Sequence, residues 1–464
     1  AGQNTIIIRG LSGDPQAEST TAGSYFGETP VSELGSTGAF GGAGHADIKL
    51  VDIERIEVLR GPQGTLYGSG SIAGTVRIIP VAPNLEIIEG KVAGRFSQTG
   101  EEGGDNTMLQ GVINVPLIED ILAVRAVVYQ FDNSGYVKNV AASQPREGVA
   151  VTESFGGIAR DRDDVGNDSY TGVRLSALWR PIDPLDITLS YLQQKIEQDG
   201  TPEIELALAG DYDQRRFNTG LAGSHSEFLE NEIDLTNLLI EYDLGWATVT
   251  NSFSLLNYDS ASEQDLTPLY TFFSPFFPTG ELADRPYYGK YQTNSDNTTN
   301  ELRLVSQLEG PLQFSAGLYY EDIERGRQLA TLWSGNPDLN TGLFQNLNEG
   351  SFTTRLKQKA VFGELSYDIT EQLKATVGGR YFDYTKTDIT EVFILFNNPD
   401  PAPLTNIDET GQTLKANLSY QVTDNLLVYG DWSEGFRLGR GQNTTSFCEA
   451  AGIPVGDIDS DTST

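Results

Sequence analysis

The chain has 464 residues, of which 65 are acidic and 31 are basic, so its formal net charge at pH 7 is −34. That charge argues against nucleic acid as a partner, because binding to phosphates begins with Lys and Arg displacing counterions. No apolar run approaches the roughly 18 residues of a membrane-spanning helix, whereas the alternating strands of a membrane β-barrel average to mild hydropathy and stay possible.

Residues 1–89 predict a small α+β unit. Short β-branched runs occur at 6–8, 53–59 and 76–79, and Gly-rich segments separate them. The glycines around Pro62 permit tight turns and close approach of the backbone to another segment. Charged residues alternate at 53–59, a pattern suited to ion pairing with a polar wall, although a solvated strand face gives the same pattern.

From residue 90 onward the sequence predicts an antiparallel sheet. Apolar residues occupy every second position from Leu414 to Tyr420, as in a strand with one oily and one polar face. About thirteen such strands are predicted, at 91–98, 107–117, 122–131, 169–180, 185–199, 231–243, 246–259, 297–308, 312–327, 353–368, 373–387, 411–422 and 425–439.

The connections between these strands alternate in length. Every second one is a tight turn, as at 180–184 or 422–425, and most of the others are long polar loops, as at 200–230. This places the short turns at one end of an up-and-down sheet and the long loops at the other, as in outer-membrane barrels. Four aromatic residues lie beside short turns, where they would meet a lipid interface: Trp179, Trp246, Tyr367 and Tyr420.

Thirteen strands cannot close an antiparallel bacterial barrel, which has an even number. The two unpaired edges would face hydrocarbon at a cost of several kcal/mol per backbone group. Residues 448–464 contain four acids, no base and no alternation, as at the start of another long loop. We therefore expect a barrel that continues beyond residue 464.

Three segments resemble one known family. The run DIERIEVLRGPQGTLYGSGSIAGTVRIIP at 52–80 closely resembles the end of the plug domain of TonB-dependent outer-membrane receptors. IIIRG at 6–10 and YFGETPV at 25–31 resemble earlier plug segments, with Glu28 at an acidic position. LLVYGDWSEGFRLG at 426–439 resembles a barrel strand of these receptors.

The resemblance implies a mainly β fold, a transmembrane antiparallel β-barrel with an N-terminal α+β plug remnant. The plug is expected at 1–89 and a partial barrel of about thirteen strands at 90–464. Family barrels have 22 strands, so we expect a fragment lacking both ends, including the upstream TonB box. Four residues are predicted to hold the plug against the barrel: Arg9, Arg55, Glu57 and Arg60. Charge reversal at Arg60 should loosen the plug and raise leakage of small antibiotics.

The resemblance also implies a function. Such receptors import a scarce nutrient across the outer membrane of Gram-negative bacteria, typically a ferric siderophore, with vitamin B12, glycans or other metals as variants. The plug rearranges when it is pulled from the inner membrane. The expected partners are TonB, outer-membrane lipid and a small-molecule ligand, and no cofactor is expected. Two alternatives stay open, a passive porin and a surface adhesin anchored on a barrel.

The ligand is expected to bind the apical part of the plug and the outside loops. Aromatic rings stack on flat ligands and sugars, and Arg pairs with anions, although loop aromatics packing together and plain surface charge are alternatives. The candidate ligand-binding residues are Tyr25, Phe26, Phe40, His45, Arg215, Arg216, Tyr270 and Phe273.

Enzyme chemistry is not predicted. His45 and His225 are the two histidines and fall in different predicted domains, so an imidazole metal site is not expected. Neither a Gly-x-Ser-x-Gly elbow nor a phosphate-binding loop occurs. Cys448, the single cysteine, cannot form an internal disulfide.

Overall fold

The computed structural model describes residues 3–11, 20–32, 44–100, 103–144, 161–206, 208, 212–216, 227–266, 287–333, 346–395, 398–399 and 404–439. One short helix, α1 (Gly64–Tyr67), lies among these residues. The strands are β1 (Gln3–Asn4), β2 (Ala22–Phe26), β3 (Thr29–Pro30), β4 (His45–Ala46), β5 (Ile53–Arg60), β6 (Gly74–Pro80), β7 (Glu89–Gln98), β8 (Asp105–Ile118), β9 (Leu122–Asn133), β10 (Val137–Asn139), β11 (Arg162–Val165), β12 (Asn167–Ile182), β13 (Leu185–Asp199), β14 (Asp213–Gln214), β15 (Phe228–Asp243), β16 (Ala247–Asp265), β17 (Tyr287–Ser306), β18 (Leu312–Trp333), β19 (Asn346–Asp368), β20 (Leu373–Leu395), β21 (Asn398–Pro399), β22 (Thr405–Thr423) and β23 (Leu426–Ser433).

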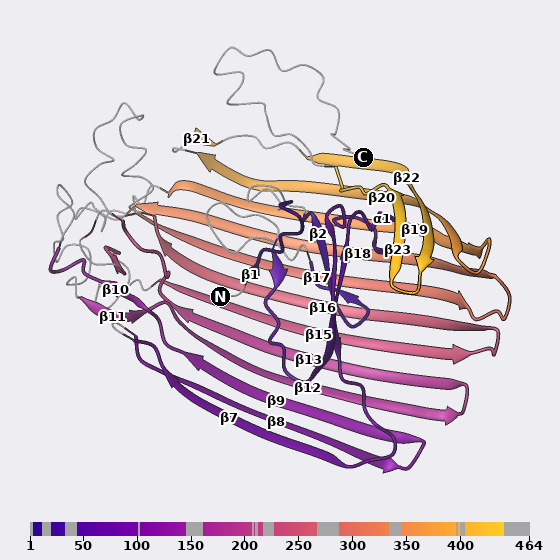
Figure 1. Ribbon diagram of the computed structural model, residues 1–464. Helices are drawn as coiled ribbons and strands as arrows, with labels where there is room; N and C mark the ends of the chain where they lie inside the picture. Colours follow the sequence, from indigo (N-terminus) through magenta and orange to yellow (C-terminus); the bar gives the residue numbers. More distant parts are fainter. Residues whose placement is uncertain are drawn as a thin grey trace, which may run out of the picture.

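Thirteen strands form one large antiparallel sheet. Their order is β7, β8, β9, β12, β13, β15, β16, β17, β18, β19, β20, β22 and β23, and β21 pairs with the end of β20. Neighbours in the sheet follow one another along the chain, and the tight turns lie together at the right of Figure 1. The predicted mainly β fold of about thirteen strands is confirmed. The barrel is partial, since β7 and β23 are the two edges of the sheet.

Most strands are longer than predicted, and one is shorter. β17 begins at Tyr287 rather than at 297, and β19 at Asn346 rather than at 353. Both faces of these extensions carry polar residues, so the oily and polar alternation that marks a strand is missing there. β23 ends at Ser433 rather than at 439, although the Glu434 N–H still donates to the Leu414 carbonyl of β22 (3.0 Å). The Ser433 hydroxyl donates to the Pro62 carbonyl (3.1 Å).

The two faces of the large sheet differ in polarity. On β12 the Arg174 side chain is buried while Leu175, which faces the other way, is 50% exposed. Exposed leucines and valines recur on that outer face, which suits a wall bathed by lipid. Within the described part of the chain, no helix is long and apolar enough to cross a membrane.

Residues 3–80 form a separate N-terminal unit. Its four-stranded sheet has the order β3, β2, β6, β5, with β2 and β6 parallel, and β1 pairs with β4. α1 lies between β5 and β6, after the Gly-rich turn. At Gly74 the φ angle is +147° and an added Cβ would lie 2.2 Å from the Leu59 carbonyl oxygen, so only glycine fits. The unit lies across the strands of the large sheet (Figure 1), and the face that it covers is called the inner face below.

Candidate functional site

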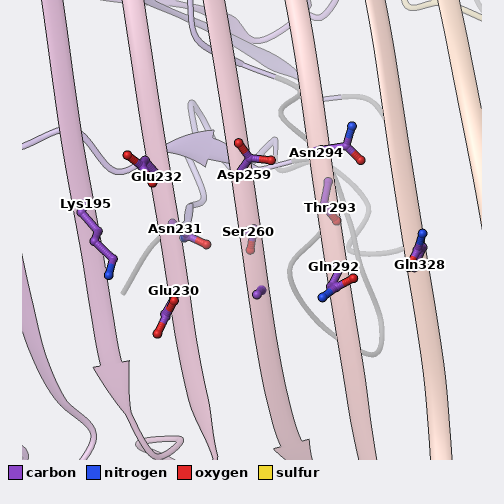
Figure 2. A pocket seen from close by; sticks show the side chains of 11 residues that line it. Lys195, Glu230, Asn231, Glu232, Asp259, Ser260, Gln292, Thr293, Asn294 and Gln328 are labelled. Atoms are coloured by element: carbon purple, nitrogen blue, oxygen red, sulfur yellow. The ribbon is translucent and has the colours of Figure 1, made fainter.

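A polar hollow lies on the outer face of the large sheet. It has a volume of about 350 Å³ and spans β13 to β18, with Lys195, Glu230, Glu232 and Asp259 among its lining residues (Figure 2). Carboxylates of this kind suit cations, but no group of three or more metal-ligating side chains is gathered anywhere in the described ranges.

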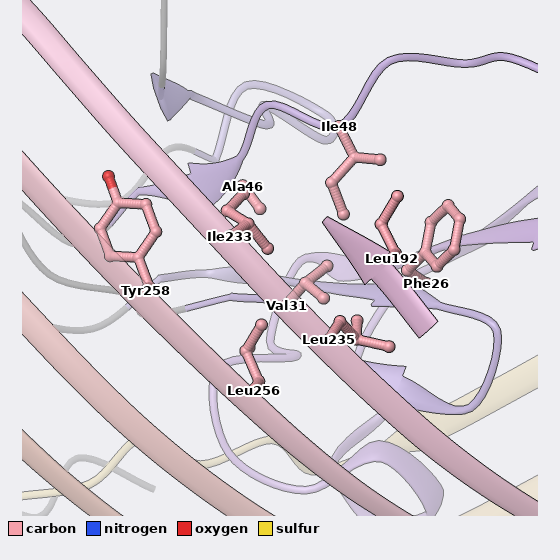
Figure 3. Packing of buried hydrophobic residues seen from close by; sticks show 9 residues of the cluster. All are labelled: Phe26, Val31, Ala46, Ile48, Leu192, Ile233, Leu235, Leu256 and Tyr258. Atoms are coloured by element: carbon pink, nitrogen blue, oxygen red, sulfur yellow. The ribbon is translucent and has the colours of Figure 1, made fainter. Parts of the chain in front are cut away.

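The inner face holds the N-terminal unit first by apolar packing. The cluster joins four residues of the unit to five inward-facing residues of β13, β15 and β16 (Figure 3). Ile233 is fully buried, and Leu256 and Val31 are each 1% exposed. Burial of this kind is the main attractive term between packed layers. The members are Phe26, Val31, Ala46 and Ile48 from the unit, and Leu192, Ile233, Leu235, Leu256 and Tyr258 from the sheet.

Asp52 makes the most buried ionic contact between the unit and the sheet. Its carboxylate accepts hydrogen bonds from Arg125 Nε (2.8 Å) and Nη2 (2.6 Å). Arg174 Nη2 donates to the same carboxylate at 2.7 Å and to the Asp52 carbonyl at 2.8 Å. The Arg125, Arg174 and Asp52 side chains are 4%, 5% and 9% exposed. One carboxylate thus joins the unit to β9 and β12 away from water.

Glu28 makes a second ionic contact between the unit and the sheet. It lies between Arg77 of the unit (2.6 Å) and Arg303 of β17 (2.9 Å). Arg77 also pairs with Glu57 (3.0 Å), and Arg303 with Glu301 on its own strand. A row of alternating charges therefore links β5 of the unit, through Glu28, to β17 of the large sheet.

The four predicted plug–barrel residues lie at the edge of this network or outside it. Arg9 and Arg60 are exposed. Arg55 pairs with two residues of its own strand, Glu54 (2.6 Å) and Glu57 (2.8 Å), and its hydrogen bond lowers the pKa of Glu57. Of the four, Glu57 alone is linked to the large sheet, through Arg77 and Glu28.

Sequence reasoning missed Asp52, Arg125 and Arg174 as contact residues. A usable signal existed, because each arginine occupies an inward position on a strand whose outward neighbours are apolar. Their shared partner was not visible, since Asp52 is 73 positions from Arg125 and 122 from Arg174.

The candidate ligand residues of the N-terminal unit lie in packed surroundings. The Tyr25 hydroxyl donates to the Tyr67 carbonyl (3.1 Å), and the two rings meet edge to face at 5.3 Å. Phe26 belongs to the apolar cluster. His45 is 4% exposed, and its Nδ1 lies 2.8 Å from the Ser24 hydroxyl. Phe40 lies outside the described residues.

His45 should make the stability of the unit depend on pH. Burial lowers its pKa from 6.5 to about 4. The unfolded chain therefore binds an extra proton between these values, so stability is full above pH 6.5 and falls by about 3 kcal/mol as the pH drops to about 4. Urea unfolding of wild type and His45→Gln across this range should show the difference. His225→Gln, which changes the other histidine, is the control, and equal pH profiles for all three proteins would contradict the expectation.

Arg215 and Arg216 lie near the long-loop end and are engaged by the protein itself. Arg215 Nε donates to Glu205 at 3.1 Å. Arg216 pairs with Glu203, donates to the Asp265 carbonyl (2.6 Å) and lies 3.8 Å from Glu227. These contacts fasten the loop between β13 and β15 to the end of β16. Two further candidates, Tyr270 and Phe273, lie outside the described residues.

The Glu227 carboxylate is fully buried in this group. It accepts hydrogen bonds from the backbone N–H groups of Asp265 (2.7 Å) and Thr201 (3.3 Å). Burial nonetheless raises its pKa to about 7. These hydrogen bonds join Glu227, just before β15, to the end of β16 and to the residues that follow β13.

The Arg325 guanidinium group lies on the inner face of β18. It shares that face of β18 with the buried residues Glu321 and Ile323, and its strand neighbours are Ser295 and Thr354. In the described part of the chain it makes no ion pair, and its Nε is buried without a hydrogen-bond partner. Arg327, two positions along, lies on the same face. An anion on this face would meet the Arg325 guanidinium group.

Comparisons with known proteins agree with this architecture. Residues 1–75 match the family described as TonB-dependent Receptor Plug Domain. Residues 154–463 match the family described as TonB dependent receptor-like, beta-barrel.

Individual relatives cover parts of the chain. The probable TonB-dependent siderophore receptor PirA of Acinetobacter baumannii is 34% identical over 145 residues, 31% of this chain and 17% of that protein. The vitamin B12 transporter BtuB of Vibrio vulnificus is 29% identical over 139 residues, 30% of this chain and 21% of that protein. The ferric yersiniabactin uptake receptor FyuA of Yersinia pestis has the same fold, with a TM-score of 0.73 at 15% identity. That match covers 99% of this chain and 61% of the FyuA chain.

Proposed function

The chain belongs to the TonB-dependent receptor family, and from that premise we propose that it imports a ferric siderophore across the outer membrane of a Gram-negative bacterium. Proteins of this family are receptors and transporters rather than enzymes, and are outer-membrane β-barrels. The N-terminal unit is the plug and the large sheet is the barrel wall, with 1–89 and 90–464 as their proposed limits. TonB is the proposed partner that drives rearrangement of the plug.

The observation that carries this proposal is the close attachment of the plug to the inner face. Buried ion pairs at Asp52, the Glu28 network and an apolar cluster hold it there. A passive porin needs an open lumen, and a plug held by such contacts occupies it. An adhesin has no need of a movable plug, and relatives such as PirA are named as siderophore receptors.

The charge of the inner face supports an anionic ligand. Arg325 and Arg327 face inward on the long-loop half of β18, although the chain as a whole has a net charge of −34. Ferric complexes of catecholates and of citrate are anions, whereas vitamin B12 carries no net negative charge. We therefore place the siderophore ahead of the cobalamin that BtuB transports.

Uptake by cells that carry the full-length receptor tests the proposal. The probes are radiolabelled iron complexes of a catecholate, a hydroxamate and citrate, each measured with and without a proton uncoupler. Import driven through TonB should stop with the uncoupler. Uptake that persists with the uncoupler indicates a porin. Failure to take up any of the three complexes, together with failure to rescue growth under iron limitation, would overturn the proposal of siderophore import.

Arg325→Gln should weaken binding of the transported complex by about 10- to 100-fold, since a hydrogen bond to a charged group contributes about 1.5–3 kcal/mol. Titration of cells with the labelled complex measures the effect. Arg355→Gln is the matched control, because Arg355 lies on the adjacent strand, faces outward and pairs with Glu324 at 56% exposure. An equal affinity loss in both variants, or no loss in Arg325→Gln, would remove Arg325 from the ligand site.

A further inference from the structure

One part of the plug contacts the wall through backbone atoms rather than through packed side chains. α1 contacts β19, β20 and β22, and this contact is called the α1 seam below. A Cβ added at Gly64 would lie 2.9 Å from the Glu434 carbonyl oxygen and 3.0 Å from Gly435 Cα. Backbone therefore faces backbone at this point, with no side chain of α1 inserted into the wall at Gly64.

Polar groups on both sides of the α1 seam are buried without partners. Thr65 of α1 is 2% exposed and Thr413 of β22 is 1% exposed. Neither hydroxyl oxygen has a hydrogen-bond partner among the residues that the structure describes. Burying a hydroxyl without a partner opposes the contact that buries it.

Arg380 adds a buried charge to the same seam. It is 3% exposed, and its guanidinium lies over the rings of Tyr319 (5.2 Å) and Phe362 (5.4 Å). A Cβ on Gly68, just after α1, would lie 3.1 Å from Arg380 Nη2. Arg380 makes no ion pair within the described ranges, and its Nε has no hydrogen-bond partner there. Stacking on rings offsets only part of the cost of dehydrating a guanidinium.

The part of the plug that lies on β9 to β16 is attached by more contacts than the α1 seam. There the apolar cluster packs on β13 to β16, Asp52 pairs with two arginines, and the Thr29 and Ser254 hydroxyls are bonded at 2.8 Å. Two hydrogen bonds flank the α1 seam, from the Ser433 hydroxyl to the Pro62 carbonyl (3.1 Å) and from Gly70 N–H to the Phe436 carbonyl (3.2 Å). Local opening starts where few contacts are lost and buried polar groups regain water.

We propose that the passage for the nutrient opens along the α1 seam, and that it favours anions because Arg380 lines it. The proposal takes import as the activity and so rests on the proposed function. It adds two points: the contact between plug and wall that opens is the α1 seam, and a solute that passes there meets the positive charge of Arg380. The β13 to β16 side stays attached while the seam opens.

Reactivity of buried cysteines tests the α1 seam without any nutrient or TonB. Thr413→Cys and Ser254→Cys place thiols at wall positions that are each 1% exposed, in β22 at the α1 seam and in β16 beside the apolar cluster. Cys448→Ser removes the native thiol from both. Outer-membrane vesicles with the full-length receptor are treated, in urea too dilute to unfold it, with an anionic sulfonate or a cationic trimethylammonium methanethiosulfonate.

Thr413→Cys should react at least tenfold faster than Ser254→Cys, and faster with the anionic reagent than with the cationic one. Adding Arg380→Gln should abolish that anionic preference. Equal or faster reaction of Ser254→Cys, or a preference that survives Arg380→Gln, would overturn the proposal. Thr65→Cys and Thr29→Cys repeat the comparison from the plug side and decide it if a wall variant does not fold. Because no import is measured, the result is independent of the uptake experiment above.

Discussion

Asp52→Asn should lower the free energy of unfolding of the plug by about 3–5 kcal/mol, because removing one partner of a buried ion pair leaves the other charge uncompensated. Here one carboxylate serves both Arg125 and Arg174, whose side chains are 4% and 5% exposed. Glu89 also pairs with Arg125, but at 3.2 Å and with half of its own side chain exposed, so it replaces little of the loss. Hydrogen exchange of residues 44–60 at increasing urea concentrations measures the effect, and influx of a small antibiotic reports a loosened plug.

The control for this change is Glu54→Gln on the same plug. The Glu54 side chain is 53% exposed and pairs with Arg55, so its loss should cost no more than about 0.5 kcal/mol. Arg60→Glu belongs in the same series, because the sequence predicts that it raises leakage. If Asp52→Asn and Glu54→Gln show the same rates of hydrogen exchange, the buried ion pairs of Asp52 do not hold the plug on the wall.

Phe26→Ala should also weaken the seat of the plug by about 3–5 kcal/mol, since deleting a buried aromatic ring removes its transfer energy and leaves a cavity. The ring is 5% exposed and packs in the cluster with Ile233 and Leu235 of the wall. Hydrogen exchange should therefore speed up in β2 and β3, and antibiotic influx should rise. The affinity for the transported iron complex should change less than about twofold, because the ring lies within the plug–wall contact and would not touch the ligand.

Val58→Ala provides the comparison for Phe26→Ala. Val58 is 50% exposed on β5 and stands outside the apolar cluster, so its truncation should cost about 0.5 kcal/mol or less. The opposite outcome for Phe26→Ala, an unchanged exchange rate with a large loss of ligand affinity, would restore Phe26 as the ligand contact that the sequence suggests.

Much of the wall could be predicted because its signal is local. Alternation such as that from Leu414 to Tyr420 predicts a strand from adjacent residues alone, and the tight turns between strands fix the antiparallel order. The prediction failed at β17 and β19, whose polar extensions show no alternation. There the strands continue because backbone pairing with neighbours extends them, as in the register from Tyr287↔Trp333 onward.

The contact residues were not predictable in the same way. Glu28 and Arg303 are 275 positions apart, and nothing in the sequence around either residue indicates that the two form an ion pair. The charges of Arg55 and Arg60 on the strand Ile53–Arg60 stand out in the sequence, but both residues are exposed in the structure. Arg325 and Arg327 carried a weak signal, since residues two positions apart on a strand share a face. Which face is the inner one depends on the plug.

The sequence by itself determined the antiparallel wall, the alternation of short and long connections and the presence of a plug, because each follows from periodicity and motifs within short stretches of chain. Tertiary structure alone decided that Asp52 joins two wall arginines, that Phe26 packs against the wall, and that Arg380 is buried beside α1 with no carboxylate paired to it among the residues that the structure describes. The physical reason is that these facts depend on how the N-terminal unit lies across strands that are distant from it in the sequence. Whether a buried charge has a partner is decided by that placement and not by its neighbours along the chain.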